Sequence, residues 1–125
     1  MTEFVLVSGG HTGGWIWREV AAGLRGAGAG AHPATLTGLG DRRHLAGPGT
    51  DMDTHVEDLV QLIDHVDAPE AVLVGHCYGI YPVLGAAGRR PDRVAPDRVR
   101  GRAPAPRRPL PAGPGPRTDA GRARP

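Results

Sequence analysis

Lysine is absent from this sequence of 125 residues, and all fifteen basic residues are arginine. The absence excludes a Walker-type phosphate loop, a Schiff-base lysine and a lysine general base, because each needs the primary amine. Cysteine occurs once, so no disulfide can form within the chain. No apolar run approaches the roughly 18 residues of a membrane span, and the short, acidic start is unlike a secretory signal. We therefore expect a cytoplasmic protein with no membrane partner.

Acidic and apolar residues become scarce in the last third of the chain. Residues 1–90 contain six Arg against ten Asp and Glu, whereas residues 91–125 contain nine Arg against three Asp, with two Val and one Leu. So few apolar side chains cannot bury enough surface to offset the entropy of the chain. We expect one domain over residues 1–94 and a disordered Arg/Pro/Ala/Gly-rich tail over 95–125. This tail has no aromatic residue to stack on bases, so we expect no specific nucleic-acid binding.

Short apolar runs alternate with helical patterns in the first part of the chain. Residues 4–7 and 71–74 are typical of strands buried on both faces, and residues 32–37 predict a weaker strand. Apolar residues then recur at helical spacing over 14–25, 53–66 and 78–88. This order predicts an α/β fold in three layers, with a parallel sheet of three strands in the order 2-1-3 and flanking helices.

The third strand of that sheet would have an open edge. We find nothing after residue 90 that predicts an outer neighbour for residues 72–74. Unpaired edges invite pairing with another chain. The pattern therefore predicts self-association through this edge.

The segment Gly75-His76-Cys77-Tyr78-Gly79 lies between a predicted buried strand and a predicted helix. It fits the G-x-nucleophile-x-G elbow, in which a strained turn exposes the nucleophile. Gly75 and Gly79 are expected because the turn brings backbone too close for side chains. The N-terminus of the following helix favours the thiolate form of Cys77. The alternative is a small cysteine buried in the core.

Three segments together resemble a known family: FVLVSGGHTGGWIW at 4–17, LTGLGDR at 36–42, and the elbow. In order and spacing they are similar to α/β-hydrolases of the plant methylesterase and hydroxynitrile lyase type, with their bacterial relatives. The resemblance covers residues 3 to about 94, the N-terminal part of that fold. It implies acyl-ester hydrolysis through Cys77, with the backbone N–H groups of Gly10 and Tyr78 as the oxyanion hole. It also implies a small-molecule ester substrate. We expect no cofactor, and no metal, because the histidines lack ligand spacing apart from Asp51, Asp53 and His55, for which helix-cap and surface roles are sufficient.

Several positions depart from the family pattern. Ser8 stands where a histidine is usual, Cys77 where most members have serine, and Ile80 where a small residue is usual. We expect Ser8 to lose a loop-orienting imidazole and Ile80 to crowd the turn.

The histidines also depart from the order nucleophile, acid, histidine that this fold uses. All six lie at or before residue 76, and the acids after Cys77 lie in or at the start of the tail. We therefore expect an inactive or single-turnover protein, unless His11, His76 or a second chain supplies the base.

Two other functions stay open. One is a non-catalytic fragment. The other is an NADP-binding βαβ module, because residues 8–13 are one glycine short of G-x-G-x-x-G, and Arg42 and Arg43 could bind a 2′-phosphate. The second predicted strand ends without the acid that binds the ribose.

Overall fold

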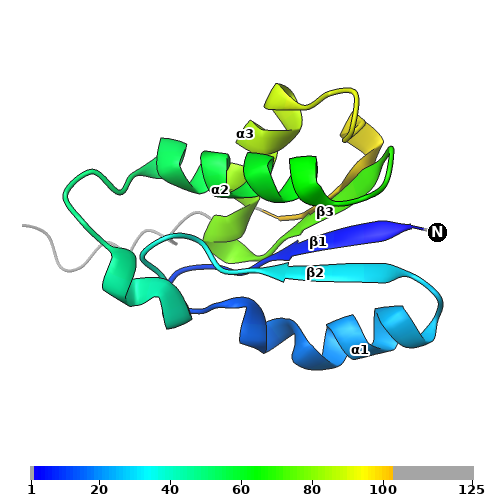
Figure 1. Ribbon diagram of the computed structural model, residues 1–125, viewed down its shortest axis with the longest axis horizontal. Coiled ribbons are helices and arrows are strands. Elements are labelled where there is room, and N and C mark those ends of the chain that lie inside the picture. The colour runs from blue at the N-terminus through cyan, green and yellow to red at the C-terminus, as the bar shows by residue number, and fades with distance from the viewer. Residues whose placement is uncertain (1, 103–125) are drawn as a thin grey trace, which may run out of the picture.

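The structure is a computed structural model and describes residues 2–102. Four parallel strands form a sheet in the order β2-β1-β3-β4. Their bounds are β1 Glu3–Val7, β2 Gly30–Ala34, β3 Ala71–Gly75 and β4 Val99–Gly101. Helix α1 (Arg18–Gly26) covers one face, and α2 (Met52–His65) and α3 (Ile80–Arg89) cover the other (Figure 1). The predicted three-layer α/β architecture is confirmed.

Strand β1 lies inside the sheet, which explains its continuous apolar run. Side chains alternate between the two faces of a strand. Val5 and Val7 enter the main core with α2 and α3, whereas Leu6 packs on the α1 side. All three are fully buried.

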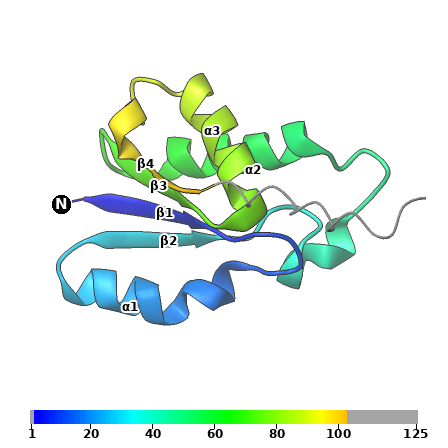
Figure 2. The same cartoon turned by 180° about the vertical axis from the view of Figure 1, so that it is seen from behind.

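The outer edge of β3 is covered, contrary to the sequence prediction. Leu73 pairs with Val99 and Gly75 with Gly101, so β4 forms the edge of the sheet (Figure 2). The prediction of three strands and an open edge at 72–74 is wrong, because backbone pairing holds a segment that is poor in apolar residues. Residues 95–101 accordingly include a 3-10 turn and a strand rather than disordered chain. The rest of the predicted disordered tail, from residue 103, lies outside the described residues. Self-association stays a prediction, now through the short β4.

Other elements differ from the sequence prediction in their bounds. The second strand ends at Ala34 instead of residue 37, and the first helix begins as a 3-10 turn, Gly14–Trp17. Helix α2 is capped by Asp51, whose side chain accepts a 3.0 Å hydrogen bond from the Thr54 amide. The Thr54 hydroxyl accepts in return from the Asp51 amide at 3.2 Å. The pair forms a capping box, so the helix begins at Met52, one residue before the predicted range 53–66.

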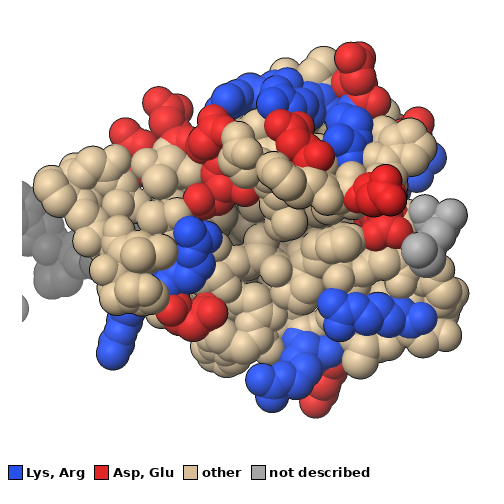
Figure 3. Space-filling view, viewed as in Figure 1, with Lys and Arg blue, Asp and Glu red and all other residues tan. Residues whose placement is uncertain are grey.

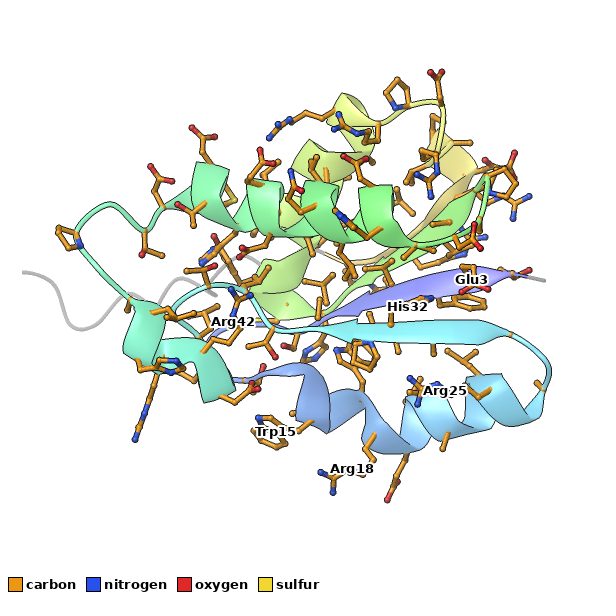
Figure 4. All side chains as sticks on the ribbon, in the orientation of Figure 1. Glu3, Trp15, Arg18, Arg25, His32 and Arg42 are labelled. Atoms are coloured by element: carbon orange, nitrogen blue, oxygen red, sulfur yellow. The ribbon has the colours of Figure 1, made fainter. Side chains whose placement is uncertain are left out.

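Polar contacts fasten the periphery of the sheet. Glu3 and His32, on neighbouring strands, form a 2.6 Å contact at the end remote from the elbow (Figure 4). Arg25 on α1 donates to the carbonyl oxygen of Ala31 at 2.7 Å. Arginine and acidic side chains are interspersed on the face drawn in Figure 3. No helix within residues 2–102 is long and apolar enough to span a membrane.

Candidate active site

The carboxyl ends of β1 and β3 lie side by side, and the chain leaves them in different directions. The chain after β1 leads into α1 on one face of the sheet, and the chain after β3 leads into α3 on the other (Figure 1). Such divergence in an open parallel sheet creates a crevice outside the strand ends, where ligands bind. The elbow predicted from the sequence lies at this point.

The turn after β3 has the geometry of a nucleophile elbow. Cys77 has φ +58°, in the left-handed region that costs a non-glycine residue energy. A Cβ atom on Gly75 would lie 2.7 Å from the Ile80 Cα, and one on Gly79 would lie 2.8 Å from the Val7 carbonyl oxygen. A side chain at either position would therefore clash with neighbouring backbone. Cys77 is exposed, so the alternative of a buried core cysteine is wrong.

The loop after β1 packs directly against the elbow. A Cβ on Gly9 would lie 2.8 Å from the Cys77 Cβ, and the thiol sulfur is 3.4 Å from the same position. Gly10 follows, is exposed, and has open space where a Cβ would lie. Tyr78 is the second residue of the 3-10 turn Cys77–Gly79, where backbone N–H groups have no intrahelical acceptor. The structure thus places the loop that contains Gly10 next to Cys77, through the contact of Gly9.

Two departures from the family pattern have structural consequences. Ser8 is 1 % exposed, and its hydroxyl has no hydrogen-bond partner among the described residues. Ile80 is buried in the main core, where it packs away from solvent. The crowding predicted for Ile80 is not seen, because the Ile80 atoms that approach Gly75 belong to the backbone and the side chain lies in the core.

A cavity of about 460 Å³ opens beside the loop after β1. Its walls are His11, Trp15, Gly38, Leu39, Gly40, Asp41 and Arg43. Trp15 is 55 % exposed and projects away from the sheet (Figure 4). Arg42, near the end of β2 in the same view, donates to the Thr35 carbonyl oxygen at 2.8 Å. This contact engages one of the two arginines that the NADP-binding alternative needs for a phosphate.

A buried histidine lies behind the elbow, so the cap or surface role expected for His55 is wrong. His55 on α2 is 7 % exposed, with Nδ1 2.9 Å from the Tyr78 hydroxyl and Nε2 2.8 Å from the Thr37 carbonyl oxygen. Burial raises the pKa of the Tyr78 phenol, and the negative charge of Asp51 adds to the shift. One signal was available: His55 precedes Leu59 by one helical turn and so shares the apolar face of α2.

Comparisons with known proteins agree with this geometry. The family model described as "Alpha/beta hydrolase family" matches residues 4–125. The chain belongs to this family. The resemblance seen in the sequence is thereby confirmed, and the sheet is the N-terminal part of an α/β-hydrolase fold.

Two relatives of this chain carry esterase names. It is 42 % identical over 96 residues to the carbendazim hydrolyzing esterase of a Nocardioides species, covering 77 % of this chain and 38 % of the relative. It is 32 % identical over 94 residues to putative methylesterase 12 of Arabidopsis thaliana, covering 74 % and 27 %.

Solved structures show the same likeness. A methylesterase from Arabidopsis superposes with TM-score 0.64 at 27 % identity, covering 76 % of this chain and 41 % of that one. Polyneuridine aldehyde esterase gives 0.65 at 26 % identity, covering 76 % and 38 %. The chain therefore spans less than half the length of these relatives.

The six histidines of this chain divide into two groups. Three are engaged away from the thiol: His32 with Glu3, His55 with Tyr78, and His65 with the Gln61 carbonyl oxygen. The other three, His11, His44 and His76, are exposed. Within residues 2–102 no group of three or more potential ligands could hold a metal ion.

Proposed function

We propose that this chain carries out the acylation half of ester hydrolysis, with Cys77 as nucleophile and a small-molecule carboxylic ester as substrate. The observation that carries the proposal is the exposed thiol on a left-handed turn, packed against Gly9. Gly10 follows Gly9 and Tyr78 follows Cys77, and we assign the backbone N–H groups of these two residues to the oxyanion hole. The esterase names of the relatives support the substrate class.

The reaction requires only these groups when the ester has a good leaving group. The thiolate sulfur of Cys77 forms a bond to the carbonyl carbon, and the π electrons move to the oxygen. The amides of Gly10 and Tyr78 donate to that oxyanion, and such a donor is worth about 3 kcal/mol. When the C=O bond re-forms, the C–O bond to the leaving alkoxide breaks and a thioester remains. The thiol proton goes to solvent.

Hydrolysis of the thioester needs a base to activate water. In this fold the acid and the histidine follow the nucleophile in the chain, and these 125 residues have no histidine after residue 76. We therefore propose a single turnover that ends in the acylated cysteine. Among residues 2–102, no carboxylate makes a hydrogen bond or ion pair with His11 or His76, whereas a triad histidine is held by one.

The test is p-nitrophenyl acetate added to the 125-residue chain. We expect a burst of close to one p-nitrophenolate per chain, no steady release afterwards, and one acetyl group on Cys77 by peptide mass spectrometry. Cys77→Ala should abolish the burst and the adduct. Sustained turnover that depends on Cys77 would overturn the single-turnover proposal. Absence of the acetyl adduct would overturn the proposed acylation and favour the alternative that the chain is a non-catalytic fragment.

A further inference from the structure

We propose that His55 and the Tyr78 side chain form a positioning bridge, which fixes the direction of the Tyr78 backbone N–H in the elbow. The inference rests on the proposed function, because that N–H is a proposed oxyanion donor. Tyr78 then has two separate roles. Its amide faces the reacting carbonyl, and its hydroxyl anchors the turn to α2.

The hydrogen bonds of His55 assign its tautomer. A carbonyl oxygen only accepts, so the Nε2 atom, 2.8 Å from the Thr37 oxygen, carries the proton. In the neutral ring Nδ1 is then an acceptor, and the Tyr78 hydroxyl donates to it at 2.9 Å. The two rings meet edge to face, with centroids 5.6 Å apart. His55 thus joins the elbow to the chain segment that follows β2.

The far end of the bridge is held by the same helix. Asp58, one turn after His55 on α2, accepts from the Thr37 amide at 2.6 Å and from the Thr37 hydroxyl at 2.7 Å. Leu59 and Ile63 of that helix are fully buried against the sheet. Helix α2 is therefore a fixed frame from which both Thr37 and Tyr78 are held.

The Tyr78 hydroxyl is suited to act as a permanent donor. Burial raises the pKa of this phenol above its usual value, so the proton stays in place at neutral and mildly alkaline pH. The Met52 sulfur at the start of α2, 3.4 Å from the hydroxyl, is a weaker and more distant acceptor for the same proton than the His55 nitrogen. Both of its neighbours therefore belong to α2.

The bridge matters because the elbow is short and strained. The 3-10 turn Cys77–Gly79 is a single turn that begins at φ +58°. A turn of this kind relaxes unless its surroundings hold it. A small displacement of a catalytic group can cost up to about 100-fold in rate. We expect the loss of one tethering hydrogen bond to cost roughly 10-fold in acylation.

The experiment compares two reactions of the same thiol. Acylation by p-nitrophenyl acetate passes through an oxyanion, whereas alkylation by iodoacetamide does not, so alkylation reports only the exposure and nucleophilicity of Cys77. Tyr78→Phe and His55→Leu should each lower the acylation rate roughly 10-fold and leave alkylation within about twofold. The double variant should lose no more than either single one. His55→Asn, which keeps an acceptor for the hydroxyl, should recover part of the rate.

Tyr81→Phe is the matched control. Tyr81 lies beside Tyr78, with ring centroids 6.2 Å apart, and is 43 % exposed. Its variant should acylate at the wild-type rate. Should His55→Leu fail to fold by circular dichroism, Tyr78→Phe decides alone, because it keeps the ring and its packing.

The outcomes separate this inference from the proposed function. Unchanged acylation in Tyr78→Phe overturns the bridge and leaves the proposed function intact. An equal fall in acylation and alkylation also overturns it, because the hydroxyl would then act only on the fold. Absence of acylation in the wild-type chain overturns the proposed function, and the bridge with it.

Discussion

The backbone amide of His76 donates a 2.9 Å hydrogen bond to the carbonyl oxygen of Val7. This bond ties the carboxyl ends of β1 and β3 together directly before their chains part. The residues that follow it on the two strands, Ser8–Gly9 and Cys77, are those that meet in the site. Close packing of the backbone after β1 against the backbone after β3 therefore shapes the candidate site.

Gly79→Ala should destabilise the chain and abolish acylation. The added methyl group would lie 2.8 Å from the carbonyl oxygens of Val7 and Ser8, and overpacking of this kind costs about 1–3 kcal/mol. Gly23→Ala is the control, because its Cβ on α1 meets nothing within 4 Å and should gain about 0.5–1 kcal/mol. Urea unfolding measures both. Equal stability of Gly79→Ala and wild type would contradict the strained elbow.

Ser8→Ala should stabilise the chain by about 1 kcal/mol, because it removes a buried hydroxyl that has no partner among the described residues. Thr12→Val, in the same loop, is the matched opposite case. The Thr12 hydroxyl donates to the Gly9 carbonyl oxygen at 2.8 Å, so its removal should cost about 1 kcal/mol. Thermal unfolding by circular dichroism gives the order of the variants. A less stable Ser8→Ala would show that the hydroxyl has a partner.

Cys77→Gly should be more stable than Cys77→Ala by about 1 kcal/mol, because glycine adopts φ +58° without strain. Both variants remove the thiol, so the difference isolates the backbone. Denaturant titration of the two proteins is the measurement. Equal midpoints would mean that the turn is relaxed in solution.

Acid should weaken the fold partly through Asp64. Hydrogen bonds from Arg90, at 2.7 and 2.8 Å, hold the pKa of the Asp64 carboxyl below its usual value. A carboxyl with a lowered folded-state pKa contributes stability at neutral pH, and this is lost as pH falls through that pKa. The urea midpoint should therefore fall between pH 7 and pH 3, and fall less in Asp64→Asn. Asp67→Asn is the control, because Asp67 is exposed and lies outside the ion pairs of residues 2–102. Its urea midpoint should fall by as much as that of wild type.

Local sequence was sufficient to predict the elements whose apolar pattern matches their burial in the structure. The runs at 4–7 and 71–74 gave their strands because both lie inside the sheet, and the periodic apolar face gave α2. The bounds of strand β2 differ from the predicted 32–37, because the strand pairs on one side only and has a weak apolar pattern. It also contains Pro33, which an edge strand tolerates. Strand β4 was missed because its three residues are held by pairing with β3, which composition does not record.

The site divides in the same way. Its elbow was predictable because glycine at 75 and 79 is a local requirement of the turn. The contact of Gly9 with Cys77 was not predicted, since it joins distant parts of the chain; the family resemblance pointed only to its neighbour Gly10. The partnership of His55 with Tyr78 was not predictable, because it depends on how α2 crosses the end of the sheet.

Pairing of β1 with β3 joins residues 3–7 to residues 71–75. The candidate site around the Cys77 thiol therefore forms only after this long-range pairing. Contacts of such sequence separation form slowly compared with local helices. Neither strand forms the site alone. In a chain whose helices have formed but whose strands β1 and β3 are unpaired, we expect Cys77 to react like a free cysteine. We therefore expect the time course of Cys77 acylation during refolding to report when β1 pairs with β3.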